Sequence, residues 1–141
     1  MRMGANVMPH NRSMPDATVI PVLSYPDVAT AVLFLTRAFG FTERLRIGDH
    51  RAQLQFAGGA IVVAQGDFGG GGNSVMVRIA NADAHCAHAE RHGARIVQRP
   101  ADMPYGERQY TATDPAGHVW TFSQTIADSD PSAWGGILLD Q

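Results

Sequence analysis

The same order of segments occurs twice along the chain, and this internal repeat restricts the fold more than any other feature. Residues 19–65 run as an apolar strand, a helix closed by Gly40 and three further strand-like segments. Residues 74–124 repeat that order, with a helix closed by Gly93. The sequence therefore predicts an α+β protein built from two βαβββ modules.

The repeat also sets the expected domain organisation. A chain of 141 residues with 45% apolar content buries one sizeable core, so we expect a single domain. Its expected parts are a flexible N-terminal arm (residues 1–17), a first module (18–66), a glycine-rich linker (67–73), a second module (74–125) and a C-terminal tail (126–141).

Composition excludes several function classes. The formal charge of -2 and the absence of any basic run argue against a nucleic-acid partner. All 11 basic residues are arginines, so the chain can form neither a lysine Schiff base nor a Walker-type phosphate loop. No apolar run has the length of a membrane span, and the lone Cys86 has no disulfide partner. We expect a cytoplasmic protein with no membrane partner.

Two segments carry a family resemblance. The string "PYGERQYTATDPAGHVWTFSQ" (104–124), supported by "LSYPDVATAVLFLTRAFGF" (23–41), resembles the vicinal oxygen chelate superfamily of glyoxalases, bleomycin-resistance proteins and dioxygenases. The resemblance covers residues 18–125 and is closest to the bleomycin-resistance-like or glyoxalase-like branch. It implies curved mixed sheets around a cup-shaped cleft. It also implies a homodimer, and the helix at 28–39 is apolar almost all round, which is consistent with burial by its own sheet and by a partner.

The metal-ligand positions of this family do not carry metal ligands here. Metal-dependent members place ligands on the first and last strands of both modules, and aligning the two halves carries those positions onto Ile20, Val62, Ser74 and Thr121. A divalent ion needs several imidazole or carboxylate donors, which these four residues do not supply. We therefore expect no metal and no cofactor.

A competing metal signal lies on the second predicted helix, where His85, His88 and His92 share one face. Their spacing permits metal binding. The resemblance, however, places the cup on the opposite face of the sheet, so we interpret the three residues as an exposed or partly buried histidine stripe.

Alternation along "SVMVRIA" sends Ser74, Met76 and Arg78 toward the cup and their neighbours toward the helix. Arg78 needs a partner there, either an internal carboxylate such as Asp114 or a group on a ligand. Trp120 and Phe122 flank Thr121 and should point into the helix-side core. The predicted ligand-binding residues are Arg78, Ser74, Met76, Gln53, Gln55, Tyr105, Tyr110, Thr121 and Trp134.

The favoured function is a metal-independent protein that binds an amphipathic or aromatic small molecule, as in the sequestration of an antibiotic or toxic metabolite. The alternative is a lyase, isomerase or dioxygenase of the same superfamily, using a displaced metal site or acid-base chemistry from His118 or Tyr110. A third hypothesis is a regulatory binding module. Trp134 lies outside the repeat and either covers a pocket edge or packs on a partner subunit.

Overall fold

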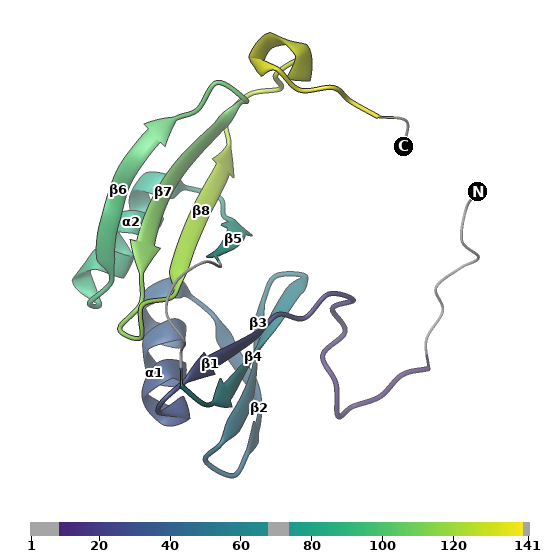
Figure 1. Ribbon diagram of the computed structural model, residues 1–141, viewed down its shortest axis with the longest axis vertical. Coiled ribbons are helices and arrows are strands. Elements are labelled where there is room, and N and C mark those ends of the chain that lie inside the picture. Colours follow the sequence, from purple (N-terminus) through teal and green to yellow (C-terminus); the bar gives the residue numbers. More distant parts are fainter. Residues whose placement is uncertain (1–8, 68–73, 140–141) are drawn as a thin grey trace.

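The computed structural model describes residues 9–67 and 74–139 and has the predicted α+β architecture of two βαβββ modules (Figure 1). Of the predicted arm, linker and tail, residues 1–8, 68–73 and 140–141 lie outside the described residues. The first module consists of β1 (Val22–Tyr25), α1 (Val28–Phe39), β2 (Thr42–Ile47), β3 (Arg51–Phe56) and β4 (Gly59–Gln65). The second consists of β5 (Ser74–Arg78), α2 (Ala82–Arg91), β6 (Arg95–Asp102), β7 (Glu107–Thr113) and β8 (Val119–Thr125), followed by the short 3₁₀ helix η1 (Pro131–Trp134).

Each module forms its own four-stranded mixed sheet, in the orders β1-β4-β3-β2 and β5-β8-β7-β6. The first strand of each module pairs in parallel with the last. Val22 lies opposite Val62 in the first sheet, and Met76 lies opposite Thr121 in the second. These are equivalent positions of the sequence repeat, so the pairing register reproduces the alignment of the two halves. In both sheets the first strand is left at an edge.

Both helices begin and end where the sequence predicts. The side chains of Asp27 and Asn81 accept hydrogen bonds from the backbone N–H three residues on, which satisfies one of the free donors at each helix start. Gly40 ends α1 in the left-handed conformation (φ 86°), which a residue without Cβ adopts without strain. The two modules therefore begin their helices with the same kind of capping hydrogen bond.

The core lies between the helices and the two sheets. Trp120 and Phe122 are fully buried there, as predicted. Phe39 at the end of α1 packs on both rings, at centroid distances of 5.4 and 4.9 Å. Helix α1 is thus covered by its own sheet and by the second module. This intramolecular burial accounts for its apolar character, so that character is no evidence for a partner subunit.

The carboxylate of Asp114 joins the two modules. It is 5% exposed, and one oxygen accepts hydrogen bonds from the backbone N–H groups of Ala116 and His118, which fixes the β7–β8 turn. The other oxygen accepts from the Tyr25 hydroxyl of the first module (2.7 Å) and from Trp120 Nε1 (3.1 Å). Burial and the neighbouring Asp114 charge raise the pKa of Tyr25 far above its usual value, so the hydroxyl stays a donor.

Replacing Asp114 by alanine should leave the Tyr25 and Trp120 donors buried without acceptors. We expect the Asp114→Ala variant to lose about 3 kcal/mol of unfolding free energy, measured by urea denaturation. The matched control is Asp128→Ala, which removes an exposed aspartate. Equal stability of the two variants would contradict the proposed role of Asp114.

Candidate functional site

Each sheet has one face covered by helices and one face that is not, and we call the latter its open face. Figure 1 shows α1 and α2 on the same side of the molecule, with the N-terminal arm on the other side of the first sheet. Alternation along β5, β7 and β8 places the following side chains on the open face of the second sheet: Ser74, Met76, Arg78, Glu107, Gln109, Thr111, Thr121 and Ser123.

A chain of hydrogen bonds lines this face, and we call its four residues, Tyr105, Glu107, Gln109 and Ser123, the polar wall. The Tyr105 hydroxyl donates to Gln109 Oε1 (2.9 Å), and Gln109 Nε2 donates to Ser123 Oγ (3.0 Å). Ser123 Oγ in turn donates to Glu107 Oε1 (2.6 Å). Because each of these three donors has an acceptor within the chain, the side chains are fixed in orientation.

Arg78 and Glu107 supply opposite charges to the open face. Hydrogen bonds from Ser123 and Thr125, together with the positive charge of Arg78, lower the pKa of Glu107, so it is ionised near neutral pH. The sequence suggested Asp114 as an internal partner of Arg78. The four hydrogen bonds of Asp114 instead come from other groups, and the carboxylate near exposed Arg78 is Glu107.

An intermodule groove of about 370 Å³ runs between the β3–β4 turn and β5, a volume within the range typical of small-molecule sites. Most of its lining is apolar, and Arg78 is the charged residue among the side chains that line it. Since Arg78 lies opposite Ser123 in the β5–β8 pairing, the groove adjoins the polar wall. The groove is lined by Val19, Pro21, Phe41, residues 56–61 and residues 75–78.

Tyr105, at one end of the polar wall, also belongs to an aromatic pair. The rings of Tyr105 and Trp134 meet edge to face at a centroid distance of 5.4 Å, which brings η1 of the C-terminal tail against the start of the β7 hairpin. Trp134 remains 43% exposed. Of the two sequence-based alternatives for Trp134, the structure shows contact with its own chain at the edge of the open face.

Gln53 and Gln55 lie on the open face of the other sheet, in β3, away from the second-sheet candidates. Gln53 is buried, with its amide bonded to Arg44 and to the backbone of Ser13. Gln55 is partly buried. The predicted ligand-binding residues thus fall on two separate open faces.

Tyr110 does not belong to either open face, which corrects its place among the predicted site residues. It is fully buried on the helix side, where its hydroxyl contacts His85 Nδ1. His118 is 4% exposed, and its Nε2 bonds to the backbone oxygen of Ser24 (2.7 Å) in the first module. Alternation explains the placement of Tyr110, because Gln109 and Thr111 take the open-face positions on β7.

Two residues of the histidine stripe, His85 and His88, bind the end of α1, whereas His92 Nδ1 bonds to the His88 backbone oxygen of its own helix. His85 Nε2 donates to the backbone oxygen of Phe39 (3.1 Å), and His88 Nε2 donates to that of Arg37 (2.8 Å). Carbonyls in the last turn of a helix lack intrahelical partners, so these imidazoles satisfy acceptors that α1 leaves free. Burial lowers the pKa of His85, which favours the neutral ring. With its proton on Nε2, the neutral ring has Nδ1 as an acceptor for the Tyr110 hydroxyl.

The donor set at the family's metal positions does not fit a divalent ion. Val62 is buried, Thr121 bonds to Thr111 Oγ1 (3.3 Å), and Ser74 is exposed at the start of β5. Ile20 precedes β1. Within residues 9–67 and 74–139, no three His, Cys, Asp or Glu side chains are grouped so that they could hold a metal ion.

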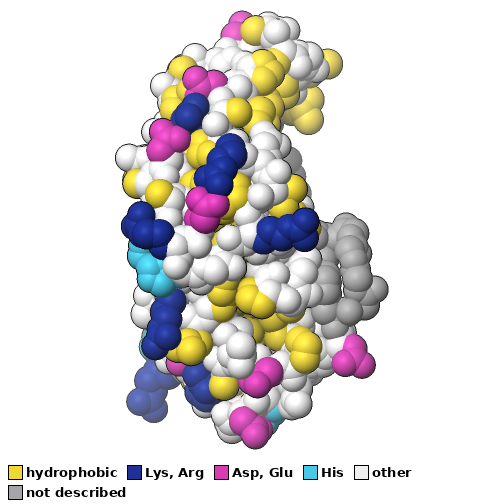
Figure 2. All heavy atoms as spheres, turned by 90° about the vertical axis from the view of Figure 1, so that its left-hand side faces the viewer, with side chains coloured by type: hydrophobic (Ala, Val, Ile, Leu, Met, Phe, Trp, Pro, Cys, Tyr) yellow, Lys and Arg dark blue, Asp and Glu magenta, His cyan; other side chains and the backbone are white. Residues whose placement is uncertain are grey.

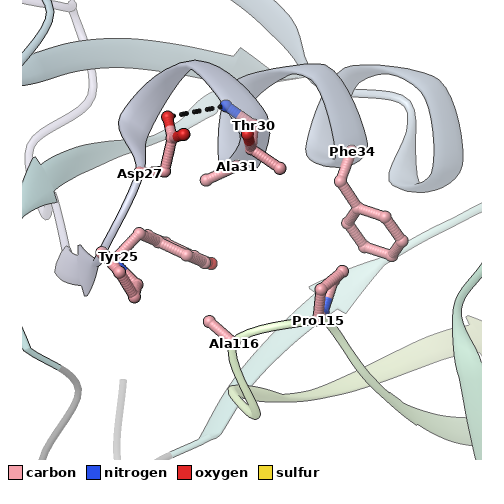
Figure 3. A pocket seen from close by; sticks show the side chains of 8 residues that line it. Tyr25, Asp27, Thr30, Ala31, Phe34, Pro115 and Ala116 are labelled. Carbon is pink, nitrogen blue, oxygen red and sulfur yellow. Dashed lines mark hydrogen bonds between the residues drawn. The ribbon is translucent and has the colours of Figure 1, made fainter.

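A smaller hollow lies at the junction of the modules, between the start of α1 and the β7–β8 turn (Figure 3). Its volume is about 160 Å³, and Tyr25, Phe34 and Pro115 present apolar surface to it. The Asp27 carboxylate beside it accepts a hydrogen bond from the Thr30 N–H. Ligand sites for drug-sized molecules measure about 300 Å³ or more, so this hollow is a poorer candidate than the intermodule groove.

The side of the molecule shown in Figure 2 carries arginines and carboxylates next to one another over the second module. Arg99 pairs with Glu90, and Arg108 pairs with Asp83 and Asp102. Such exposed, mutually neutralised pairs contribute little to stability and present no field of one sign.

None of the helices in the described part of the chain combines the length and apolarity needed to cross a membrane.

Sequence reasoning missed Glu107, Gln109, Ser123 and Arg44. The same alternation that placed Thr121 on the open face also places Ser123 and, on the paired strand, Gln109 and Glu107. Extending it along β7 and β8 would have found all three. Arg44 gave no such signal, because it lies at a break in the β2–β3 pairing register.

Paired βαβββ modules with an uncovered sheet face define the structural class of vicinal oxygen chelate proteins. A family model described as Glyoxalase/Bleomycin resistance protein/Dioxygenase superfamily matches residues 18–122. The chain belongs to this superfamily. A search of curated proteins found no match.

Solved structures agree with this assignment. TioX from Micromonospora sp. ML1 is 34% identical over 76% of this chain and 97% of its own, with a TM-score of 0.62. A superfamily enzyme from Burkholderia phytofirmans PsJN is 16% identical over 76% of this chain and 97% of its own, with a TM-score of 0.68. The fosfomycin resistance protein FosX from Listeria monocytogenes is 17% identical over 79% and 94%, with a TM-score of 0.65. The last two show likeness of fold.

The lowered pKa of His85 predicts a pH-dependent stability. As pH falls through about 6.5, the unfolded chain binds a proton at this position before the folded chain does, so the unfolding free energy should decrease below that pH. The His85→Gln variant cannot titrate there and should show a smaller decrease between pH 7 and pH 5 in urea titrations. His50→Gln, which removes an exposed histidine, should retain the wild-type pH dependence.

Proposed function

We propose that this protein binds an amphipathic or aromatic small molecule without a metal ion, in the manner of the glyoxalase/bleomycin-resistance type, and that it acts in the cytoplasm. The observation that carries the proposal is the position of Arg78, which stands where the apolar intermodule groove meets the polar wall. An apolar part of a ligand would lie in the groove. Its polar groups would bind Arg78, Glu107 and Gln109.

The residue types at the metal positions support binding over metal-dependent catalysis. Ile20, Val62, Ser74 and Thr121 offer two aliphatic chains and two hydroxyls, none of which is a usual ligand for zinc, iron or manganese. The two residues considered for acid-base catalysis, His118 and Tyr110, are buried in contacts with their own chain. Sequestration requires affinity alone, which a preorganised face supplies.

The ligand site can be tested with the chain's own fluorophores. Trp120 is buried and Trp134 is 43% exposed beside Tyr105, so a ligand on the open face should change the emission of Trp134. In a screen of aromatic and peptide antibiotics, we expect a ligand whose affinity falls about tenfold in Arg78→Ala, equivalent to one lost charge-assisted hydrogen bond. Arg95→Ala removes an exposed arginine of the same sheet and should bind normally. Dissociation constants that survive chelator treatment support the proposal, whereas affinity lost with chelator and restored by metal contradicts it.

We further propose that the protein is a homodimer in which a second copy helps to complete the site. In one chain the two open faces belong to separate sheets, and among the described residues the edge strands β1 and β5 each pair with one strand only. Apolar side chains are exposed along them, with Val22 at 55% and Met76 at 65%. The tail adds a further apolar run at residues 137–139. Surface of this kind is typical of association sites.

Sedimentation velocity at micromolar concentration should give a dimer. Met76→Glu places a charge on the exposed edge strand and should shift the protein to monomer, since burying an unpaired carboxylate is unfavourable. Val97→Glu is the matched control, because Val97 is a 60% exposed apolar residue on the far edge strand β6. A wild-type monomer at these concentrations would contradict the dimer.

A further inference from the structure

Two side chains on the open face of the first sheet form a pair of hydrogen-bond donors. The β2–β3 register breaks between Glu43 and Leu45, so Arg44 is the extra residue of a β-bulge, and bulges re-aim side chains. Arg44 Nη1 donates to Gln53 Oε1 (2.7 Å). This bond fixes the amide of Gln53 with its Nε2 free to donate, so Arg44 Nη2 and Gln53 Nε2 act together. We call Arg44 and Gln53 the donor pair.

Both groups of the donor pair donate hydrogen bonds to the chain's own N-terminal arm. Arg44 Nη2 donates to the backbone oxygen of Arg12 (2.8 Å), and Gln53 Nε2 donates to that of Ser13 (2.8 Å). Pro15 of the arm is buried, and Gln53 is only 6% exposed. Gln53, which the sequence assigned to ligand binding, is therefore bonded to the arm, whose residues 12 and 13 contact this face.

The chemistry of this contact is that of peptide recognition. The two acceptors are carbonyls of consecutive residues, and backbone carbonyls are common to every peptide. A guanidinium and an amide held by a mutual hydrogen bond can therefore bind any segment that presents two successive carbonyls in a similar conformation, because each group donates to one carbonyl. The arm has an advantage over a free ligand because its covalent link to β1 gives it a high effective concentration.

We propose that residues 12–15 are a built-in occupant of the first open face, and that a peptide-like ligand with two successive amide carbonyls binds Arg44 and Gln53 in their place. The arm would then act as a strap that a ligand displaces. The displacement part rests on the proposed ligand-binding function. The attachment of the arm does not, and it can be tested without any ligand.

Trypsin provides the first test, because it cleaves after Arg12, whose carbonyl the donor pair holds. In the full chain, Arg44→Ala and Gln53→Leu should each raise the rate of this cleavage about tenfold, as expected when a protecting local contact is lost. Arg51→Ala removes an exposed arginine from β3 and should leave the rate unchanged. Intact-mass analysis follows the product that begins at Ser13, and circular dichroism verifies that each variant is folded. Equal rates in all four proteins would overturn the proposal.

A capped synthetic peptide with the sequence of residues 9–16 tests the ligand class. Pro15→Asp in the full chain puts a carboxylate at the buried anchor of the arm and should free the donor pair, as faster cleavage after Arg12 would verify. Fluorescence anisotropy of the labelled peptide should then show binding at least about tenfold tighter to Pro15→Asp than to the wild type. Adding Gln53→Leu should abolish the gain.

The outcomes separate this proposal from the proposed function. No peptide binding to a chain with a released arm overturns the peptide-like ligand class, while the Arg78 ligand screen still stands. Binding that is unaffected by Gln53→Leu overturns the role of the donor pair. Conversely, peptide binding through Gln53 in a protein with no response of Trp134 to any antibiotic would support the strap and count against the second-sheet site.

Discussion

The buried carboxylate of Asp114 is the interaction on which the arrangement of the two modules depends. It fixes the β7–β8 turn through two backbone N–H groups and reaches the first module through the Tyr25 hydroxyl. A buried carboxylate is tolerated only when hydrogen bonds satisfy it, so the turn and the junction must form together. The same carboxylate also binds the His118 N–H and Trp120 Nε1, so the junction fixes the start of β8.

Polar groups are divided between the two sides of the sheets. On the helix side they bind the chain itself, as Asp114 binds Tyr25 and as His85 and His88 bind the last carbonyls of α1. On the open faces they form short networks with exposed ends, such as the one that runs from Tyr105 to Glu107. This division explains why histidines, often the first candidates for catalysis, serve the fold here.

The superfamily fold supports many chemistries, so the fold alone does not define what this chain does. The side chains on the open faces carry that information. The proposed recognition of a ligand that is both polar and apolar rests on three features of the second open face: the ionised Glu107, the exposed Arg78 and the Tyr105–Trp134 pair. On the first sheet, the donor pair and the arm form a second polar contact, which we propose as a further ligand site.

The sequence by itself determined the repeat, the element order, the capping residues and the face on which Thr121 and Arg78 lie, because each depends on residues close together in the chain. Period-two alternation needs only one strand. Tertiary structure alone decided that Asp114 contacts Tyr25, His85 contacts Phe39 and Arg44 contacts Arg12, because these partners lie far along the sequence in the other module or in the arm. It also decided that α1 is buried by its own chain. A local pattern shows that a surface is apolar, whereas the element that covers it is set by how distant segments pack.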